Sequence, residues 1–484
     1  MRRAELALAL AAALLVFTRL GATSLTEPDE PRHGAIAEEM RALRHGPAQL
    51  AVPRLNDEVY TQKPPLYYWL AAAAGAPFGR VTELAARAPS ALAGFGTVLV
   101  TARLGAVTFG PATGLAAGAV LLTLPTFVED ARRARPDALV VFFVTLALFL
   151  AWRLHAGIGS SRRNRLGLHA ALGLGMLAKG PVAFVLVALG LGAWLAWERR
   201  IADLRHYASA SALALSLAPV ALWLATAAAL APEGYLREAV GENVLGRFFA
   251  GTSHEQPFLF HLRELPSAFL PWTLAWPLVF LAARRALAPG AKPDVAQATR
   301  FFVAFAAAGF AFFSLSAGKR DVYLLPLYPA LALLVAEGVR AALPAGAPAA
   351  TARRRRFLAA GFGTAMTALA GYLVIYLPAV DTSRSIRPAA EVAARLAPAG
   401  SPVGLVRNGA LVGGLRYYAA RPVEPIGSSR GLQTFVETGG AVAVADSRYL
   451  PEIEAAVDAR VVFRQRLRGD EVVVLALRPR ARSS

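Results

Sequence analysis

The sequence predicts a mainly α-helical protein that crosses a membrane about 11 times and carries a small C-terminal α/β domain. Composition is the first indication, because 56% of the 484 residues are hydrophobic and 17% are charged, whereas soluble domains average about 25% charged residues. Long apolar runs are the second. The third is a change near residue 381, where apolar runs shrink to strand length, at 402–406, 441–445, 461–463 and 472–477, and the Gly469-Asp470 pair predicts a closing hairpin. We expect a membrane part at 1–380 and an α/β domain at 381–484.

Six apolar runs contain no Asp, Glu, Lys or Arg and have the length of a membrane span. A helix needs about 20 residues to cross the hydrocarbon core. The runs cover residues 111–128, 180–197, 208–232, 265–283, 301–318 and 357–380. Shorter runs and a first span near residues 6–25 bring the expected total to about 11.

The formal charge of +19 fits membrane topology better than nucleic-acid binding. Arg-rich loops beside spans set orientation and touch anionic lipid head groups, and no basic face on a soluble module is evident, so we expect no nucleic-acid partner. With the N-terminus in the cytoplasm and residues 64–79 only half inserted, the basic loops fall on the cytoplasmic side. This orientation places the first loop, residues 23–63, and the C-terminal domain on the periplasmic side of an inner membrane.

The first outward loop carries two adjacent carboxylates, Asp29 and Glu30, followed by Pro31. Proline suits the first position of a helix and an acidic residue suits its cap. We expect a helix at 31–43 with both carboxylates at its N-terminal end, where they are candidates for catalysis and substrate binding. A capped amphipathic helix without a catalytic role explains the same pattern.

Four cations lie at outward membrane edges, where the positive-inside rule predicts few. Charged side chains at the edge of a membrane are candidates for function. The four cations together predict a binding site for an anion. The four are Lys63, Lys179, Lys319 and Arg320. Two prolines follow Lys63 and hold it on an extended turn; a lysine that snorkels to the interface is the alternative for it.

Further polar residues lie in the outward loops. Asp137 lies at the start of a span, on the same outward side, and is a candidate site residue. The alternative interpretation is that Asp137 caps the helix and pairs with Arg135. The segment after residue 241 contains Arg247, His254 and Glu255, which are candidates for binding an acceptor or a divalent cation. One adjacent His and Glu do not define a metal site, so the metal and any cofactor stay unknown. The absence of cysteine excludes thiol catalysis.

The order and spacing of several motifs over residues 5–340 resemble a known group of enzymes. The motifs are Asp29-Glu30 with residues 36–40, residues 63–69 (KPPLYYW), residues 87–92, residues 179–181, Pro271-Trp272 and residues 319–326. They resemble the aminoarabinose transferases that modify lipid A and the broader protein O-mannosyltransferase group of GT-C glycosyltransferases.

The resemblance implies an inverting transfer of a sugar from a polyprenyl-phosphate donor at the periplasmic face. It implies that Asp29 is the catalytic carboxylate, that Lys63 holds the lipid phosphate and that Asp137 is a second acidic position. Tyr323, beside the Lys319-Arg320 pair, is a candidate substrate contact. Gln62 departs from the pattern, because aminoarabinose transferases carry Glu there, and a neutral side chain loses the pairing that a cationic amino sugar favours.

Elementary chemistry agrees with a transferase. A phosphate leaving group stays anionic and needs cations, and an acceptor hydroxyl needs a carboxylate base. We expect that hydroxyl on a lipid, such as lipid A, or on a protein. A transporter or flippase of a lipid-linked precursor is the alternative, but it predicts internal repeats and polar residues at mid-membrane. A structural or assembly protein would leave the outward cations unexplained.

Overall fold

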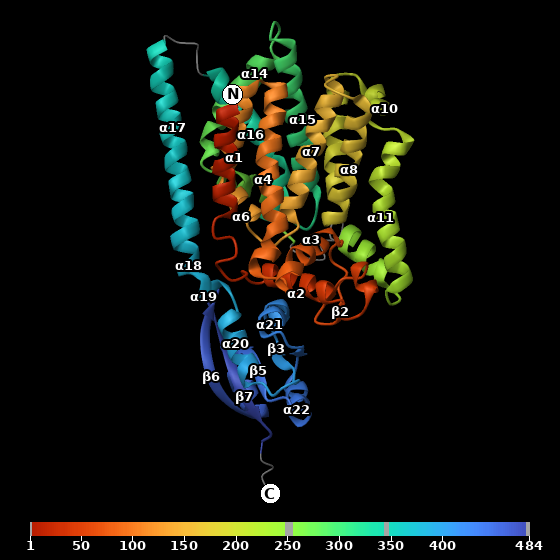
Figure 1. Ribbon diagram of the computed structural model, residues 1–484, viewed down its shortest axis with the longest axis vertical. Coiled ribbons are helices and arrows are strands. Elements are labelled where there is room, and N and C mark those ends of the chain that lie inside the picture. The colour runs from red at the N-terminus through yellow and green to blue at the C-terminus, as the bar shows by residue number, and fades with distance from the viewer. Residues whose placement is uncertain (1, 247–254, 343–347, 481–484) are drawn as a thin grey trace. The chain divides into compact units, whose positions relative to one another are not determined.

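The computed structural model describes residues 2–246, 255–342 and 348–480. The chain forms two compact units, which Figure 1 shows with their helices and strands. The first unit comprises Met1–Thr18, Thr61–Tyr67 and Ser90–Gly371, and the second comprises Arg19–Tyr60, Tyr68–Pro89 and Tyr372–Ser484. Each unit is therefore assembled from segments that are far apart in the sequence.

The first unit consists of helices that pack side by side, for example α7 against α8 and α9 against α15. Its helices are α1 (Arg2–Phe17), most of α4 (Glu83–Thr108), α5 (Pro111–Leu122), α6 (Pro125–Ala131), α7 (Asp137–His155), α8 (Ser161–Lys179), α9 (Val182–Trp197), α10 (Leu204–Tyr207), α11 (Ala210–Leu230), η4 (Arg237–Gly246), α13 (Phe260–Ala268), α14 (Trp276–Leu287), α15 (Pro293–Leu315), η6 (Asp321–Leu327), α16 (Tyr328–Ala342) and α17 (Pro348–Gly371).

Six helices among the described residues are long and apolar enough to cross a membrane, or up to eight if each of two bent pairs counts as one span. The protein is thus a multi-pass membrane protein. The bends break two of the predicted apolar runs: α5 and α6 meet at 75°, and α13 meets the segment Trp272–Leu287 at 100°. Pro125 and Pro271 lie at these breaks, where a proline lacks the N–H that would continue the helix.

The segment after Lys63 forms one short helix, α3 (Leu66–Gly75), of 10 residues. At 1.5 Å per residue it is about 15 Å long, half the thickness of a hydrocarbon core of about 30 Å. This length agrees with a half-inserted segment at residues 64–79.

The second unit contains the predicted α/β domain. Its five strands have the order β4-β3-β5-β7-β6, with β3 parallel to β4 and β5, and β7 antiparallel to β5 and β6. The strands are β3 (Val403–Val406), β4 (Val423–Ile426), β5 (Val442–Asp446), β6 (Asp458–Leu467) and β7 (Asp470–Arg478). Every residue of β3 and β5 is buried, as expected for central strands covered on both faces.

Helices cover both faces of this sheet and form two apolar cores. Ile386 and Leu415 belong to one core and Phe435 and Ile453 to the other. This part of the chain begins with α18 (Leu377–Ala379) and α19 (Asp381–Arg384), and the helices that contribute to the cores are α20 (Arg387–Leu396), α21 (Val412–Ala419), α22 (Ser429–Glu437) and α23 (Leu450–Ala456). The predicted hairpin at Gly469-Asp470 is confirmed, because Leu467 and Asp470 are paired at its turn.

The first loop folds with this domain in the same unit. It contains α2 (Asp29–Ala42) and the short hairpin of β1 (Arg54–Leu55) and β2 (Glu58–Val59), and α2 packs against α21. The prediction that Pro31 opens the helix is wrong by two residues, since α2 begins at Asp29. The backbone N–H of Glu30 donates to the Thr26 carbonyl at 3.3 Å, so the first turn already forms ahead of Pro31.

Candidate active site

The central feature of the first unit is an ion pair between Asp137 and Lys179. Asp137 is the first residue of α7 and Lys179 is the last residue of α8, and a short loop joins the other ends of these helices. The start of one helix therefore lies beside the end of the next. The two side chains are only 10% and 15% exposed, so Asp137 takes part in a mostly buried ion pair with a residue of the neighbouring helix.

Tyr323 completes the surroundings of Lys179. The Lys179 Nζ lies 4.8 Å from the centroid of the Tyr323 ring, and that ring lies 5.9 Å from the ring of Phe313. An ammonium is attracted to the face of an aromatic ring. Lys179 is therefore held between a carboxylate and an aromatic face, and the structure brings together three of the predicted site residues.

More charges surround the Asp137 carboxylate. Lys63 and Arg135 both act on it electrostatically, and so does a second buried carboxyl group, Asp130 of α6. Sequence reasoning missed Asp130, although it is an acidic residue directly before the Arg-rich segment 132–135. The first unit thus gathers two carboxylates and several cations in a mostly buried place, where electrostatic interactions are stronger than in water.

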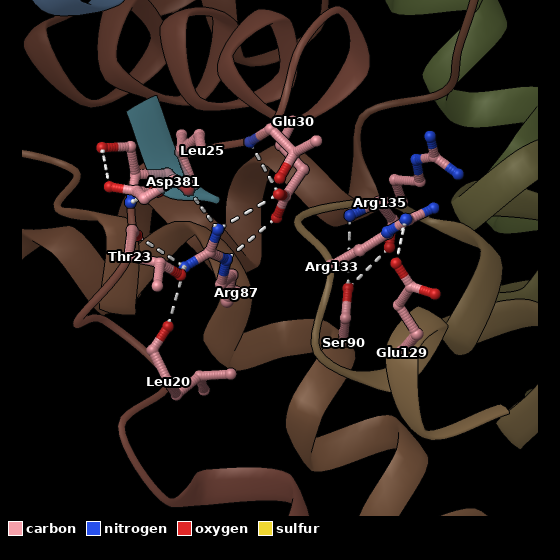
Figure 2. A network of polar contacts seen from close by, with 12 residues as sticks. Leu20, Thr23, Leu25, Glu30, Arg87, Ser90, Glu129, Arg133, Arg135 and Asp381 are labelled. Atoms are coloured by element: carbon pink, nitrogen blue, oxygen red, sulfur yellow. Dashed lines mark hydrogen bonds and ion pairs between the residues drawn. The ribbon is translucent and has the colours of Figure 1, made fainter. Parts of the chain in front are cut away.

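The arginines of this segment hold the surrounding backbone. The Arg132 guanidinium donates to the carbonyls of Leu15 and Val16, both at 2.8 Å, and so caps the end of α1. Arg133 forms an ion pair with Glu129 one turn earlier, and Ser90 Oγ donates to the Arg135 carbonyl at 2.6 Å (Figure 2). These contacts fix the turn that leads into Asp137.

The remaining predicted residues of the first unit have other partners. Lys319 is buried, and its Nζ donates to the carbonyl of Gln256 at 3.1 Å. Next to it, Gly318 forms a backbone bridge with Glu255, whose side chain is exposed. Lys319 therefore holds the segment at 255–256. Arg320 is half-buried at the start of η6.

The polar segment before residue 247 approaches Lys63. The Asn243 amide Nδ2 donates to Thr61 Oγ1 at 3.3 Å, two residues before Lys63. Between them Gln62 is exposed, and Lys63 is half-buried. Arg247 and His254 lie outside the described residues. Within the described ranges, no group of three or more His, Asp or Glu side chains could hold a metal ion.

In the second unit, Asp29 begins α2 and lies close to the guanidinium of Arg32. Its Oδ1 is 3.7 Å from Arg32 Nη1, and the two side chains are 13% and 22% exposed. The N-terminal end of a helix carries partial positive charge and stabilises a carboxylate in its anionic form. Asp29 therefore lies at this positive end of α2 and is partly accessible.

A buried arginine network fixes the loop that leads to Asp29 (Figure 2). Arg87 of α4 pairs with Glu30 through two hydrogen bonds, at 2.9 and 3.1 Å. Its guanidinium also donates to three carbonyls at 2.7–2.9 Å, those of Leu20, Thr23 and Ser24. Glu30 in turn accepts a hydrogen bond from the Thr26 N–H at 2.8 Å. The structure therefore gives Glu30 a partner that sequence reasoning missed, a buried arginine 57 residues later.

The C-terminal domain holds the same loop from the other end of the chain. The Asp381 carboxylate accepts from the Ser24 N–H and hydroxyl, both at 2.9 Å, and the Tyr418 hydroxyl accepts from the Leu25 N–H at 2.6 Å. Beside them the Glu27 side chain is buried, and that burial raises its pKa well above the usual value for a glutamate. These contacts join segments more than 350 residues apart.

Comparison with known proteins supplies a second line of evidence. The profile of the family described as dolichyl-phosphate-mannose-protein mannosyltransferase matches residues 62–223, which include Lys63, Asp137 and Lys179. An undecaprenyl phosphate-alpha-4-amino-4-deoxy-L-arabinose arabinosyl transferase of Pseudomonas aeruginosa is 32% identical over 320 residues, 64% of this chain and 54% of that protein. The corresponding transferase 2 of Pseudomonas fluorescens is 29% identical over 64% of this chain and 51% of its own length. The match thus spans about half the length of these two relatives.

Solved structures show the same fold over a longer range. ArnT from Cupriavidus metallidurans, bound to undecaprenyl phosphate, superposes with a TM-score of 0.79 at 20% identity and covers 97% of both chains. The archaeal oligosaccharyltransferase AglB from Archaeoglobus fulgidus, in complex with an inhibitory peptide and a dolichol-phosphate, gives a TM-score of 0.58 at 14% identity and covers 92% of this chain and 69% of its own. In sequence along its membrane part, and in fold along nearly its whole length, the chain resembles GT-C glycosyltransferases of the aminoarabinose and protein mannosyl transferase type.

Proposed function

We propose that this chain is an integral-membrane glycosyltransferase that moves a sugar from a polyprenyl-phosphate donor to a hydroxyl group of a lipid, of the lipid A kind, or of a protein. The observation that carries the proposal is the buried charge cluster of the first unit, in which Lys179 pairs with Asp137 under the influence of Lys63. The relatives support a polyprenyl-phosphate donor, because their names specify undecaprenyl phosphate as the carrier of the sugar.

In this proposal the protein lies in the inner membrane with about 11 spans. Residues 1–380 form the membrane part, and the α/β domain at 381–484 lies in the periplasm. The distribution of Arg-rich loops supports this orientation. The short helix α3 supports the half-inserted segment on which the orientation depends.

The cations of the first unit bind the donor phosphate. Lys63 supplies an ammonium on a turn fixed by two prolines. Lys179 is shared, since an incoming phosphate competes with the Asp137 carboxylate for its ammonium. Phosphate leaves as an anion, so cations that are already positioned stabilise the transition state without a general acid. Arg320 and Tyr323, both in the segment at 320–323, extend the same site.

Asp29 acts as the base that accepts the proton of the acceptor hydroxyl. Its partial exposure allows an acceptor to reach it, and the Arg87 network fixes the loop that precedes it. The new bond forms between the acceptor oxygen and the anomeric carbon while the bond to the phosphate oxygen breaks. Asp29 receives the proton, and the polyprenyl phosphate leaves with the electron pair.

Transfer can be tested with purified protein in lipid nanodiscs, a labelled undecaprenyl-phosphate sugar and a lipid A acceptor. We expect label in the acceptor, and we expect Asp29→Asn to slow transfer by about 10²–10⁴-fold without changing the melting temperature. Asp470→Asn, at an exposed turn of the same unit, is the matched control. Movement of label across the bilayer without transfer would support a flippase and contradict the proposal, and an active Asp29→Asn variant would remove Asp29 from the mechanism.

A further inference from the structure

An open pocket of about 670 Å³ lies in the second unit, and none of its lining residues has a role in the proposed transfer. It is lined by Tyr372, Tyr376, Val380, Ser383, Arg384, Arg468 and Gly469. The residues come from three segments: the helical stretch at 372–380, α19 and the turn between β6 and β7. Its volume lies in the range of about 300–1,000 Å³ that is usual for small-molecule sites.

Two tyrosines form its aromatic wall. The rings of Tyr372 and Tyr376 are stacked, with centroids 5.3 Å apart and planes at 20°. They belong to a π-helical segment, η7 (Tyr372–Tyr376), a rare geometry that is frequent at functional sites. This segment lies near the end of the candidate membrane span Ala360–Ala379, where tyrosines typically mark the boundary between lipid and water.

Two arginines form its polar wall, and none of the seven lining residues is acidic. The backbone fixes them both: the Arg468 N–H donates to the Ser383 carbonyl at 2.8 Å, and the Arg384 carbonyl accepts from the Glu27 N–H at 2.9 Å. The Arg468 side chain donates from Nη1 to the Glu27 carbonyl at 3.2 Å. A guanidinium has five N–H donors, so a contact through one of its nitrogens leaves further donors that can bind an anion.

An apolar strip borders the pocket on the same helical segment. Ile375 is 72% exposed and Val374 is 38% exposed, beside the ring of Tyr376 at 53%. Side chains of this kind, at the end of a membrane span, are solvated by lipid chains. A ligand that fills the pocket and also contacts this strip must have an anionic head and a hydrocarbon tail.

We propose that this pocket binds the phosphate head group of an anionic lipid, and that it is distinct from the donor phosphate site assigned to Lys63. Arginine fits phosphate because its planar fork donates two parallel hydrogen bonds. The stacked tyrosines cover the glycerol or sugar next to the phosphate, and the lipid chains follow Val374 and Ile375. A free phosphate would use the arginines alone and gain nothing from the aromatic wall or the apolar strip.

The test measures lipid binding to the full-length protein in detergent by native mass spectrometry. The probes are dioleoyl phosphatidic acid, dioleoyl phosphatidylcholine and inorganic phosphate. We expect phosphatidic acid to bind more tightly than phosphatidylcholine, and inorganic phosphate to compete only weakly. The double variant Arg384→Gln/Arg468→Gln should lose about tenfold or more in affinity for phosphatidic acid. Arg395→Gln/Arg430→Gln removes the same charge from exposed positions of the same unit and should leave binding unchanged.

A second variant tests the pocket without removing charge. Ser383 is exposed, so Ser383→Tyr should fold, fill part of the pocket and weaken binding of phosphatidic acid. The melting temperature of each variant shows whether it is folded. Undiminished binding in the folded double variant or in folded Ser383→Tyr would overturn the proposal. Competition by inorganic phosphate as strong as that by phosphatidic acid would also overturn it, because the site would then recognise an ion and not a lipid.

Discussion

At the scale of single residues, the pair of Asp137 and Lys179 shows why a membrane-edge charge needs a partner. Both side chains are nearly buried, and removing a charge from water costs several kcal/mol unless an opposite charge is close. Asp137 therefore balances the charge of Lys179. In the proposed mechanism a donor phosphate displaces the carboxylate, and the net charge around Lys179 then stays balanced.

Replacement of Lys63 tests the donor site directly. Loss of a charge-assisted hydrogen bond costs about 1.5–3 kcal/mol, so Lys63→Ala should weaken binding of a polyprenyl phosphate by about tenfold or more. Lys63→Arg should recover part of the affinity, and Lys292→Ala removes an exposed lysine as the control. Binding is measured by titration of the lipid into protein in nanodiscs. If Lys63→Ala binds as tightly as the parent protein, the lysine is only an interfacial anchor.

Much of the site could be predicted from residue types, but their partners could not. The positive-inside rule singled out Lys63 and Lys179 because they are cations in loops that the predicted topology places on the outward side, where the rule expects few. The partner of Lys179 depends on which helix ends meet, and spacing does not contain this information. For the same reason Asp130 and the contact between Glu30 and Arg87 became visible only in the structure.

At the scale of elements, the contact between α2 and α21 depends on a glycine. A Cβ added at Gly413 would lie 2.5 Å from Arg32 Cα, a backbone atom of α2 that cannot move by itself. Gly413→Ala should therefore push the helices apart and cost about 1–3 kcal/mol of stability. A Cβ at Gly409 meets nothing within 4 Å, so Gly409→Ala is the control. Thermal unfolding in detergent measures both, and equal melting temperatures would contradict this close packing.

The elements that were predicted are those with a clear pattern. The strands β3, β5, β6 and β7 appeared as short apolar runs, and the Gly469-Asp470 turn marked the hairpin of β6 and β7. The strand β4 was not predicted, because it contains Pro425 and proline is unfavourable inside a sheet. In the structure β4 is an edge strand, where proline is tolerated. The helix α21 was not predicted, because it contains Gly413 and Gly414 and glycine has a low helix propensity. Packing against α2 outweighs that cost.

At the scale of the whole molecule, distant segments meet around Glu27, and the burial of its side chain predicts that stability depends on pH. The raised pKa means that folded Glu27 keeps its proton at pH values where an unfolded glutamate has lost it. The free energy of unfolding should therefore fall as pH rises above the usual carboxyl range toward the raised pKa, by at most about 1.4 kcal/mol per pH unit.

Glu27→Gln should remove this dependence, because an amide cannot ionise. Thermal midpoints between about pH 4 and pH 8 measure it, and Glu424→Gln, at an exposed position of β4, should keep the slope of the parent protein. A Glu27→Gln variant with the same slope would show that other groups control the pH dependence.

The proposed orientation of the chain places the C-terminal domain in the periplasm, and it follows from the distribution of arginine in the loops. Cytoplasmic loops near spans are enriched in Lys and Arg, and residues 153–165 and 353–356 are two such basic segments. Both face the cytoplasm only if residues 64–79 do not cross the membrane. The 10-residue length of α3 agrees with this condition, because a helix of about 15 Å is too short to span the hydrocarbon core.

A reporter that folds only in the periplasm, fused after Ser484, should therefore be active, and one that works only in the cytoplasm should be silent. The same two reporters fused after Gly159, in the basic loop between α7 and α8, should give the opposite result. Activity of the cytoplasmic reporter after Ser484 would show that residues 64–79 span the membrane and that the orientation is inverted.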